Sequence, residues 1–289
     1  MAGSSMRDIK RRIRSVKSIE QITNAMKLVS AAKLRQARNV YDRTHEAQAF
    51  ITDSIDRLCA DAADIPELFL AGTREIKKTC YIVVTSNRGL AGSYNINVIK
   101  AAEQKMADDP EKPILVCVGA RGKKYFEKRG YDVFSEYLEP PEKITFMQTR
   151  ELMAPVFELY TGGEIDEIIL VTTVFVSTIE QHIATRVLLP FEPKQKTEEK
   201  GLIKLPEYEP GPAEVFSYLV PKYIEIMIYR LLIEAATCEH AARRLAMQNA
   251  TDNAREMTDD LELFYNRARQ AAITSEITEI VSGADAIKQ

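Results

Sequence analysis

Two turns in the sequence carry residue types that could bind a phosphate group. The loop 86–95 (SNRGLAGSYN) follows an apolar run and precedes a segment with helical spacing, where a dinucleotide-binding fold places its phosphate loop. Its glycines, Gly89 and Gly92, complete neither the GxGxxG fingerprint nor the GxxxxGKS/T loop. The turn 119–124 (GARGKK) is basic and opens a helix, so its backbone amides could bind an anion. We expect ordinary turns at both places, with Arg88 as a surface or partner contact.

No set of side chains has the spacing of a catalytic or metal site. The four cysteines lie far apart without a CxxC pair, which suits a reducing compartment and argues against zinc. With three histidines and no recognisable Ser/His/Asp arrangement, we predict a chain that is not an enzyme, with no catalytic residues, no cofactor and no metal. An apolar run of about 18 residues and an apolar leader are both missing, so we expect neither a membrane span nor a secretory signal.

Positive charge is concentrated at the start of the chain. Residues 1–40 hold ten lysines and arginines against two acidic residues, so this segment carries +8 while the whole chain carries −3. Such a segment is expected to seek an acidic partner, which could be nucleic acid, anionic lipid or an acidic protein surface. Because it lacks interleaved aromatic residues and any DNA-reading module, we predict no nucleic-acid binding.

Long helices are predicted at both ends of the chain, because residues 4–65 and 222–282 contain neither glycine nor proline. Apolar and small residues recur every 3.5 residues from Ile9 to Leu58 and again from Ile224 to Leu245. This period is that of a left-handed coiled coil. We expect the two helices to pair antiparallel and to project beyond the middle of the chain.

The middle of the chain alternates between strand and helix patterns. Strands are predicted at 80–85, 114–118, 167–176 and 183–189, and helices at 95–106, 123–129 and 149–160. Continuous apolar strands alternating with helices favour a parallel sheet covered on both faces. The predicted fold class is α/β, with a Rossmann-like α/β middle domain inserted between two long terminal helices that form an antiparallel left-handed coiled coil. The predicted domains are residues 1–62, 63–212 and 213–289.

The end of the last helix carries an apolar stripe of Ile273, Ile277, Ile280 and Ala284. The coiled-coil pattern fails near residues 245–252, so we expect this helix to continue alone for about 35 residues. A lone helix end frays unless something covers its apolar side. The stripe therefore predicts a cover supplied by another chain.

Five segments are similar to one known family. They are 7–17 (RDIKRRIRSVK), 21–34 (QITNAMKLVSAAKL), 88–92 (RGLAG), 242–253 (ARRLAMQNATDN) and 265–284 (YNRARQAAITSEITEIVSGA). Together they resemble the gamma subunit of F-type (F1Fo) ATP synthases of the bacterial type. Asn24 and Leu28 replace a lysine and a methionine common in the family, and Ala91 replaces a cysteine. The inserted regulatory cysteine pair of the chloroplast form has no counterpart here.

This resemblance implies a central-stalk rotor subunit that mechanically couples transmembrane ion flow to ATP synthesis or hydrolysis at the beta subunits. The terminal helices would lie inside the alpha3beta3 hexamer, and the middle domain would sit on the c-ring of Fo beside the epsilon subunit. The chain would be non-catalytic and peripheral, at the cytoplasmic face of the bacterial cell membrane.

The matching motifs also imply which residues contact partners. Contacts with alpha and beta are expected from Met26, Lys27, Arg243, Arg269, Gln270, Thr274, Ile277 and Ile280. Arg88, Gly89 and Gly92 are expected to form either a partner contact or only a turn.

Three other functions stay open at this point. One is a nucleotide-dependent enzyme, which a complete phosphate-loop motif would favour. Another is a coiled-coil nucleic-acid or protein tether without rotary function. The third is the central stalk of the vacuolar-type family, against which the inserted α/β domain counts.

Overall fold

The computed structural model describes residues 6–59, 66–72, 75–191, 209 and 211–287, and the side chains of these except 44–59, 212–213 and 283–287. The chain forms two compact units. The two-helix unit comprises Met1–Ser30 with Arg244–Gln289, and the sheet unit comprises Ala31–Arg243. The predicted boundary between residues 62 and 63 lies outside the described residues, and the three-domain division stays a prediction.

Both terminal segments are helical, as expected: α1 runs over Met6–Cys59 and α5 over Pro212–Ile287. The strands between them are β1 (Thr79–Val84), β2 (Ile114–Val118), β3 (Val133–Tyr137), β4 (Glu167–Phe175) and β5 (Gln181–Leu189). The helices between them are α2 (Tyr94–Met106), α3 (Ala120–Lys128) and α4 (Phe146–Thr161), with 3-10 turns η2 (Glu67–Phe69) and η3 (Pro141–Lys143).

The five strands form one sheet in the order β3-β2-β1-β4-β5. β1, β2, β3 and β4 pair in parallel, but β5 is antiparallel to β4, which corrects the predicted parallel sheet. Only residues 176–180 join β4 to β5, whereas a parallel connection needs a crossover of about a dozen residues or more. β3 escaped prediction because it is an edge strand whose side chains alternate between half-buried and exposed.

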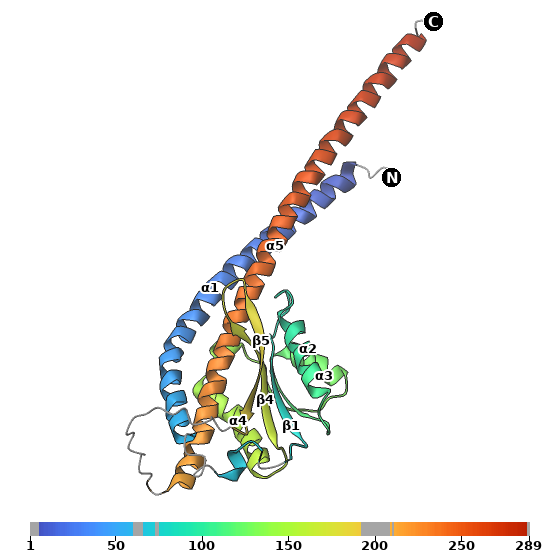
Figure 1. The fold of residues 1–289 in the computed structure, drawn as a ribbon. Coiled ribbons are helices and arrows are strands. Elements are labelled where there is room, and N and C mark those ends of the chain that lie inside the picture. The colour runs from blue at the N-terminus through green and yellow to red at the C-terminus, as the bar shows by residue number, and fades with distance from the viewer. Residues whose placement is uncertain (1–5, 60–65, 73–74, 192–208, 210, 288–289) are drawn as a thin grey trace. The chain divides into compact units, whose positions relative to one another are not determined.

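Both faces of the sheet are covered, as Figure 1 shows for the sheet unit. Tyr81 and Val83 of β1 pack on one face against α2 and α3. Ile82 and Val84 pack on the other face against α4 and residues 216–235 of α5. Because each fully buried large apolar side chain contributes roughly 1.5–3 kcal/mol, this segment of α5 is a structural element of the core.

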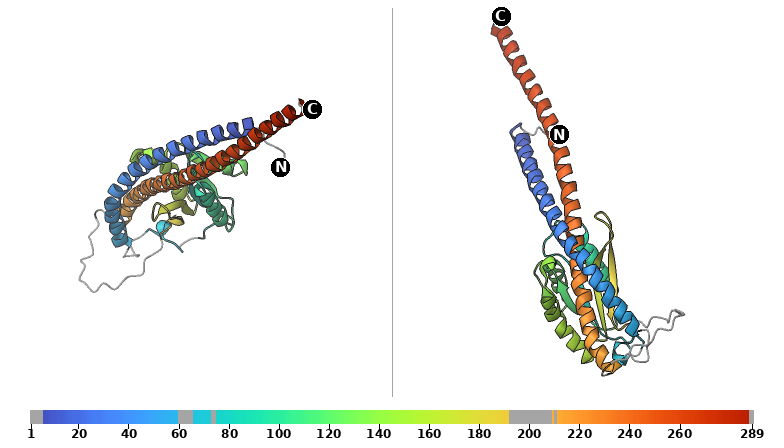
Figure 2. Two further views of the ribbon diagram at one scale, coloured as in Figure 1. Left: turned by 90° about the horizontal axis from the view of Figure 1, so that it is seen from above. Right: turned by 90° about the vertical axis from the view of Figure 1, so that its left-hand side faces the viewer.

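The two-helix unit is an antiparallel pair, which Figure 2 shows from two directions. Three contacts show that the helices are antiparallel, because the residue number of the contact in α5 rises as that in α1 falls. The hydroxyls of Thr23 and Thr251 lie 2.9 Å apart, Arg255 Nε donates to Glu20 Oε1 at 2.8 Å, and Lys17 Nζ lies 2.6 Å from Glu262 Oε1.

The contact between these helices extends further than the sequence predicts. Residues of α5 that are buried or half-buried recur at a 4-3 spacing, at Met247, Thr251, Ala254, Thr258, Leu261, Tyr265, Ala268 and Ala272. The predicted end of the pattern near residues 245–252 is therefore wrong. It was set by following the series from Leu245, which is 40% exposed, to Asn249 and Asp252, which are exposed as well. Thr251 is buried because its hydroxyl lies near both Thr23 and the carbonyl of Met247.

Ile19 also departs from the predicted stripe of α1, since its side chain is 49% exposed. The neighbouring Glu20 is half-buried instead and forms the ion pair with Arg255. An ion pair between Glu20 and Arg255 therefore lies where the sequence predicted an apolar contact of Ile19.

Gly119 offers a test of the close approach between β1 and the start of α3. A Cβ atom there would lie 2.2 Å from the backbone oxygen of Thr85, and Gly119 has a φ of +93°. We predict that Gly119→Ala lowers the free energy of unfolding by about 3 kcal/mol or more, measured by urea denaturation. Gly130→Ala is the control, because φ there is +78° but no atom lies within 4 Å, and about 1 kcal/mol is expected. Equal losses would show that the contact with Thr85 is unimportant.

Candidate functional site

The crevice in which doubly wound folds bind nucleotides is filled by the chain itself. It lies at the carboxyl ends of β1 and β4, where the strand order reverses. Ala91 from the loop after β1 and Tyr94, the first residue of α2, pack there with Cys238 of α5. The Tyr94 hydroxyl donates to the carbonyl of Ala235 at 3.3 Å, and the Cys238 thiol donates to the carbonyl of Thr173 at 3.6 Å. Helix α5 thus occupies the place of a ligand.

At the second candidate anion site, the start of α3, the backbone amides already donate hydrogen bonds within the chain. The first three backbone amides of this helix donate to the side chain of Asn87 at 2.9 Å, the carbonyl of Ser86 at 3.1 Å and the hydroxyl of Thr85 at 2.9 Å. Amides at a helix start attract phosphate only when they are unpaired. Both turns singled out in the sequence are therefore built from internal hydrogen bonds.

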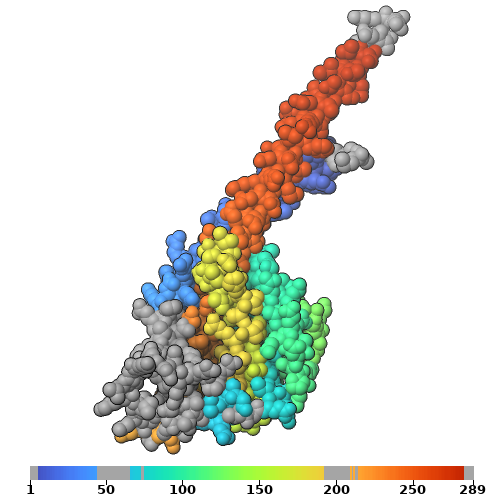
Figure 3. All heavy atoms as spheres, viewed as in Figure 1, coloured from blue at the N-terminus to red at the C-terminus, as the bar shows by residue number. Residues whose placement is uncertain are grey.

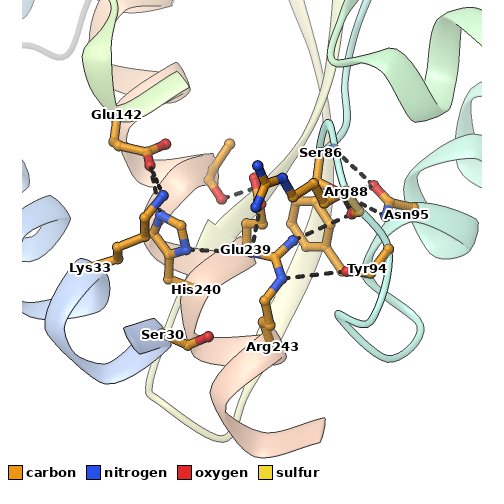
Figure 4. Close-up of polar contacts among 12 residues, drawn as sticks. Ser30, Lys33, Ser86, Arg88, Tyr94, Asn95, Glu142, Glu239, His240 and Arg243 are labelled. Carbon is orange, nitrogen blue, oxygen red and sulfur yellow. Dashed lines mark hydrogen bonds and ion pairs between the residues drawn. The ribbon is translucent and has the colours of Figure 1, made fainter. Parts of the chain in front are cut away.

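Within the sheet unit, a buried charge network joins α1 and α5 to the turn η3, and Figure 4 shows its side chains. We define the charge network as Lys33 of α1, Glu142 of η3, and Glu239, His240 and Arg243 of α5. Lys33 Nζ lies 3.0 Å and His240 Nε2 lies 3.2 Å from the same oxygen, Oε1 of Glu142. Arg243 Nη1 lies 2.7 Å from Glu239 Oε1. All of these side chains except that of Lys33 are at least nine-tenths buried.

Arg243 links this network to the loop after β1. Its guanidinium donates to the carbonyls of Arg88 at 3.3 Å and Gly89 at 3.4 Å, and it lies 3.4 Å from Nδ1 of His240. A guanidinium group can only donate, so Nδ1 of His240 is the acceptor in this contact. Arg243 thus ties the loop after β1 to both Glu239 and His240 of α5.

The fold lowers the pKa of the Glu142 carboxyl. Burial alone would raise the pKa of its carboxyl, but His240, a backbone hydrogen bond and Lys33 outweigh burial and lower the pKa from 4.5 to about 2. Nearby Tyr137 responds in the opposite way, because burial and then Glu139 and Glu142 raise the pKa of its hydroxyl to about 12. The carboxylate therefore holds two cationic or donor groups at once at neutral pH.

The structure separates the sequence-predicted contact residues into three groups. Arg88, Gly89 and Arg243 come together, with Gly92 in the same loop at a φ of +58°. Met26 and Lys27 are half-buried on α1 in the two-helix unit. The remaining predicted residues are exposed on α5: Arg269, Gln270, Thr274, Ile277 and Ile280. That any of these residues touches another subunit stays a prediction.

Sequence reasoning missed Lys33, Glu142, Glu239 and His240 as a cluster. The only local signal was the spacing of Glu239 and Arg243, which is that of a helical ion pair. Nothing in the pattern placed Glu142, from a turn about one hundred residues away in sequence, beside both helices.

The end of α5 is bare on all sides. Every side chain described from residue 273 to 282 is exposed, and Ile273, Ile277 and Ile280 are 47%, 57% and 71% exposed. Figure 3 shows the coloured part of this end as a single narrow column of atoms. The predicted apolar stripe is present, although the side chain of Ala284 lies outside the described residues. Residues 273–287 of α5 lie beyond Ala272, the last half-buried position described, and they make up about 15 residues or ~22 Å of helix. This stretch is shorter than the predicted 35 residues.

Part of the acidic partner expected for the basic segment lies in the chain itself. The two-helix unit carries an acidic stretch on α5 between Asp252 and Glu262, and two ion pairs join it to α1, from Arg255 to Glu20 and from Lys17 to Glu262. Arg7, Lys10 and Arg14 remain exposed. The charge available to another molecule is thus smaller than the sequence count suggests.

Comparisons with known proteins agree with one another. A family model described as ATP synthase matches residues 5–287. The ATP synthase gamma chain of Alkaliphilus metalliredigens is 45% identical and covers 99% of this chain and 100% of its own length. The sodium-ion-specific gamma chain of Acetobacterium woodii is 42% identical over 98% of this chain and 99% of its own. The rotor of the Euglena gracilis mitochondrial ATP synthase has the same fold, with a TM-score of 0.69 at 20% identity, covering 93% of this chain and 99% of its own.

Glu142 gives this site a measurable pH dependence. A carboxyl whose pKa is lowered on folding stabilises the protein above its ordinary pKa of 4.5, and this stability is lost as the pH falls towards 2. We predict that Glu142→Gln costs about 2–3 kcal/mol of unfolding free energy at pH 7, and that wild type and variant converge between pH 4.5 and 2. Urea denaturation across this pH range measures both effects.

The control is Glu180→Gln, because Glu180 and His182 form an exposed pair at 3.1 Å. Exposed pairs contribute little to stability, so this variant should match wild type at every pH. A Glu142→Gln cost that does not change with pH would contradict the assignment of the stability to the carboxylate charge.

Proposed function

This chain belongs to the ATP synthase gamma-chain family, and we propose on that premise that it is the central-stalk rotor subunit of an F-type ATP synthase. In this role it couples transmembrane ion flow mechanically to ATP synthesis or hydrolysis at the beta subunits. Its partners are the alpha and beta subunits, the epsilon subunit and the c-ring of Fo.

One structural observation supports the proposal most directly: apolar side chains are exposed at the end of α5. An isolated helix of about 15 residues is marginal in water and gains most of its stability from packing. The exposed isoleucines Ile273, Ile277 and Ile280 need a cover, and every other described side chain between residues 273 and 282 is exposed as well. A ring of alpha and beta chains around this end would supply one. Apolar contact is weakly directional, so it suits a shaft that turns inside its sleeve.

We further propose that the chain is not itself catalytic. The packing of Tyr94 against Cys238 supports this, because these side chains lie where a doubly wound fold binds a nucleotide. Among the described residues, no helix is both long and apolar enough to cross a bilayer. The protein would reach the cytoplasmic face of the bacterial membrane through the complex, as a peripheral subunit.

The residues expected to contact alpha and beta remain part of the proposal. Arg269, Gln270 and Thr274 are exposed on α5 and free to meet a surrounding subunit. Met26 and Lys27 lie half-buried on α1. Arg243 differs from these, because its guanidinium already contacts Gly89 and Glu239 of the same chain. No observation favours a nucleic-acid or protein tether without rotary function.

The purified chain should neither bind nor hydrolyse ATP. The physical reason is the filled crevice and the committed amides at the start of α3. Isothermal calorimetry and a phosphate-release assay measure the two properties, with the complete complex as the positive control. Micromolar affinity of the chain alone for ATP would contradict this expectation.

Amide exchange should show where the sleeve lies. In the free chain we expect rapid exchange from about Ile273 onwards and slower exchange at Met247–Thr258, where the helix pair is buried. On assembly with alpha and beta, the first region should become protected, while strand β1 changes little. Hydrogen–deuterium exchange read by mass spectrometry measures this, and equal exchange of the helix end in both states would remove the argument for a sleeve.

A further inference from the structure

We propose that the charge network of Lys33, Glu142, Glu239, His240 and Arg243 is a torsional clamp. It fixes α1 and α5 to the loops of the sheet unit near the points where both helices leave that unit. This inference rests on the rotor function proposed above. A rotor must pass torque along its long helices, and the sheet unit ends at Ala31 on α1 and at Arg243 on α5. Lys33 lies on α1, and His240 and Arg243 on α5, within a turn or so of these positions.

The first anchor of the clamp is Glu142, and η3 holds it rigidly. Pro140 and Pro141 fix two successive φ angles before Glu142. The strand that leads into this turn is held through the carbonyl of Tyr137, which accepts from Gly119 N at 2.9 Å. After the turn, Thr145 closes a capping box at the start of α4. The Glu142 carboxylate, which contacts both helices, therefore lies on a turn that is fixed before and after it.

A second anchor lies on a different loop. Arg243 of α5 donates to the carbonyls of Arg88 and Gly89, after β1. The start of that loop is held in turn by Asn95, whose Oδ1 accepts from Ser86 N at 2.8 Å. A single anchor would act as a pivot, whereas two anchors on separate loops resist rotation of α5 about its own axis.

The chemistry of the contacts suits this task better than apolar packing does. Charge-assisted hydrogen bonds have defined directions and are stronger than neutral ones, while apolar contact opposes sliding only weakly. Burying charges gives little net stability compared with an apolar core. The position of the network, where the helices leave the sheet unit, gives these buried charges a mechanical role.

The test uses the chain assembled with alpha and beta subunits. A bead is attached through Glu164→Cys, an exposed position of the sheet unit, in a background with Cys59→Ser. The variance of the bead angle during a catalytic pause reports torsional stiffness. Glu142→Gln should reduce stiffness by roughly half, since one of two anchors is weakened, and Glu142→Ala should reduce it further. ATP hydrolysis without load should stay at the wild-type rate.

Glu103→Gln is the matched control. Glu103 also accepts from two side chains, Tyr125 at 2.9 Å and Arg129 at 3.3 Å, but it joins α2 to α3 and touches neither long helix. Its loss should leave stiffness unchanged. Wild-type stiffness in both Glu142 variants would overturn the clamp, as would an equal loss in the Glu103 variant. Failure of the wild-type chain to rotate with alpha and beta would instead overturn the proposed function.

Discussion

A helix of the length of α5 is stable only where another surface covers its apolar residues, and the identity of that surface changes along the helix. In the sheet unit the cover is the sheet, with α4 and α1, and nearly every side chain from Arg230 to Arg243 is buried. In the two-helix unit the cover is α1 alone, and burial falls to one residue in three or four. From residue 273 to 282, the last side chain that the structure describes, every residue of α5 is exposed. The fraction of buried residues thus falls along α5 from the sheet unit to its end.

Electrostatics follows the same division. In the sheet unit, Glu142 and Arg243 lie near the points where α1 and α5 leave the unit. Their charges are buried and make contacts of defined geometry. In the two-helix unit the ion pairs Lys17–Glu262 and Glu20–Arg255 are largely exposed, so they set register and pairing more than stability. The chain thus uses buried charge where a fixed geometry is needed and exposed charge where only alignment is needed.

The sequence was most informative where one physical signal dominated. The absence of glycine and proline predicted both long helices, and unbroken apolar runs predicted β1, β2 and β4. It was least informative where neighbours distant in sequence decide the outcome. Thr251 was not identified as a core residue because its partner Thr23 is 228 positions away. The charge network was missed for the same reason, since Glu142 is unremarkable until folding brings it to Lys33 and His240.

The antiparallel helix pair joins the first residues of the chain to some of the last, and this has a consequence for synthesis. At roughly 5–20 residues per second, the 228 positions between Thr23 and Thr251 take on the order of 10–45 seconds to be translated. During that interval the inner residues of α1, such as Ile9, have no partner from the same chain. The nascent protein therefore exposes an apolar, positively charged helix for many seconds. A chaperone or an already assembled neighbour that binds this helix would determine how much of the newly made chain escapes aggregation.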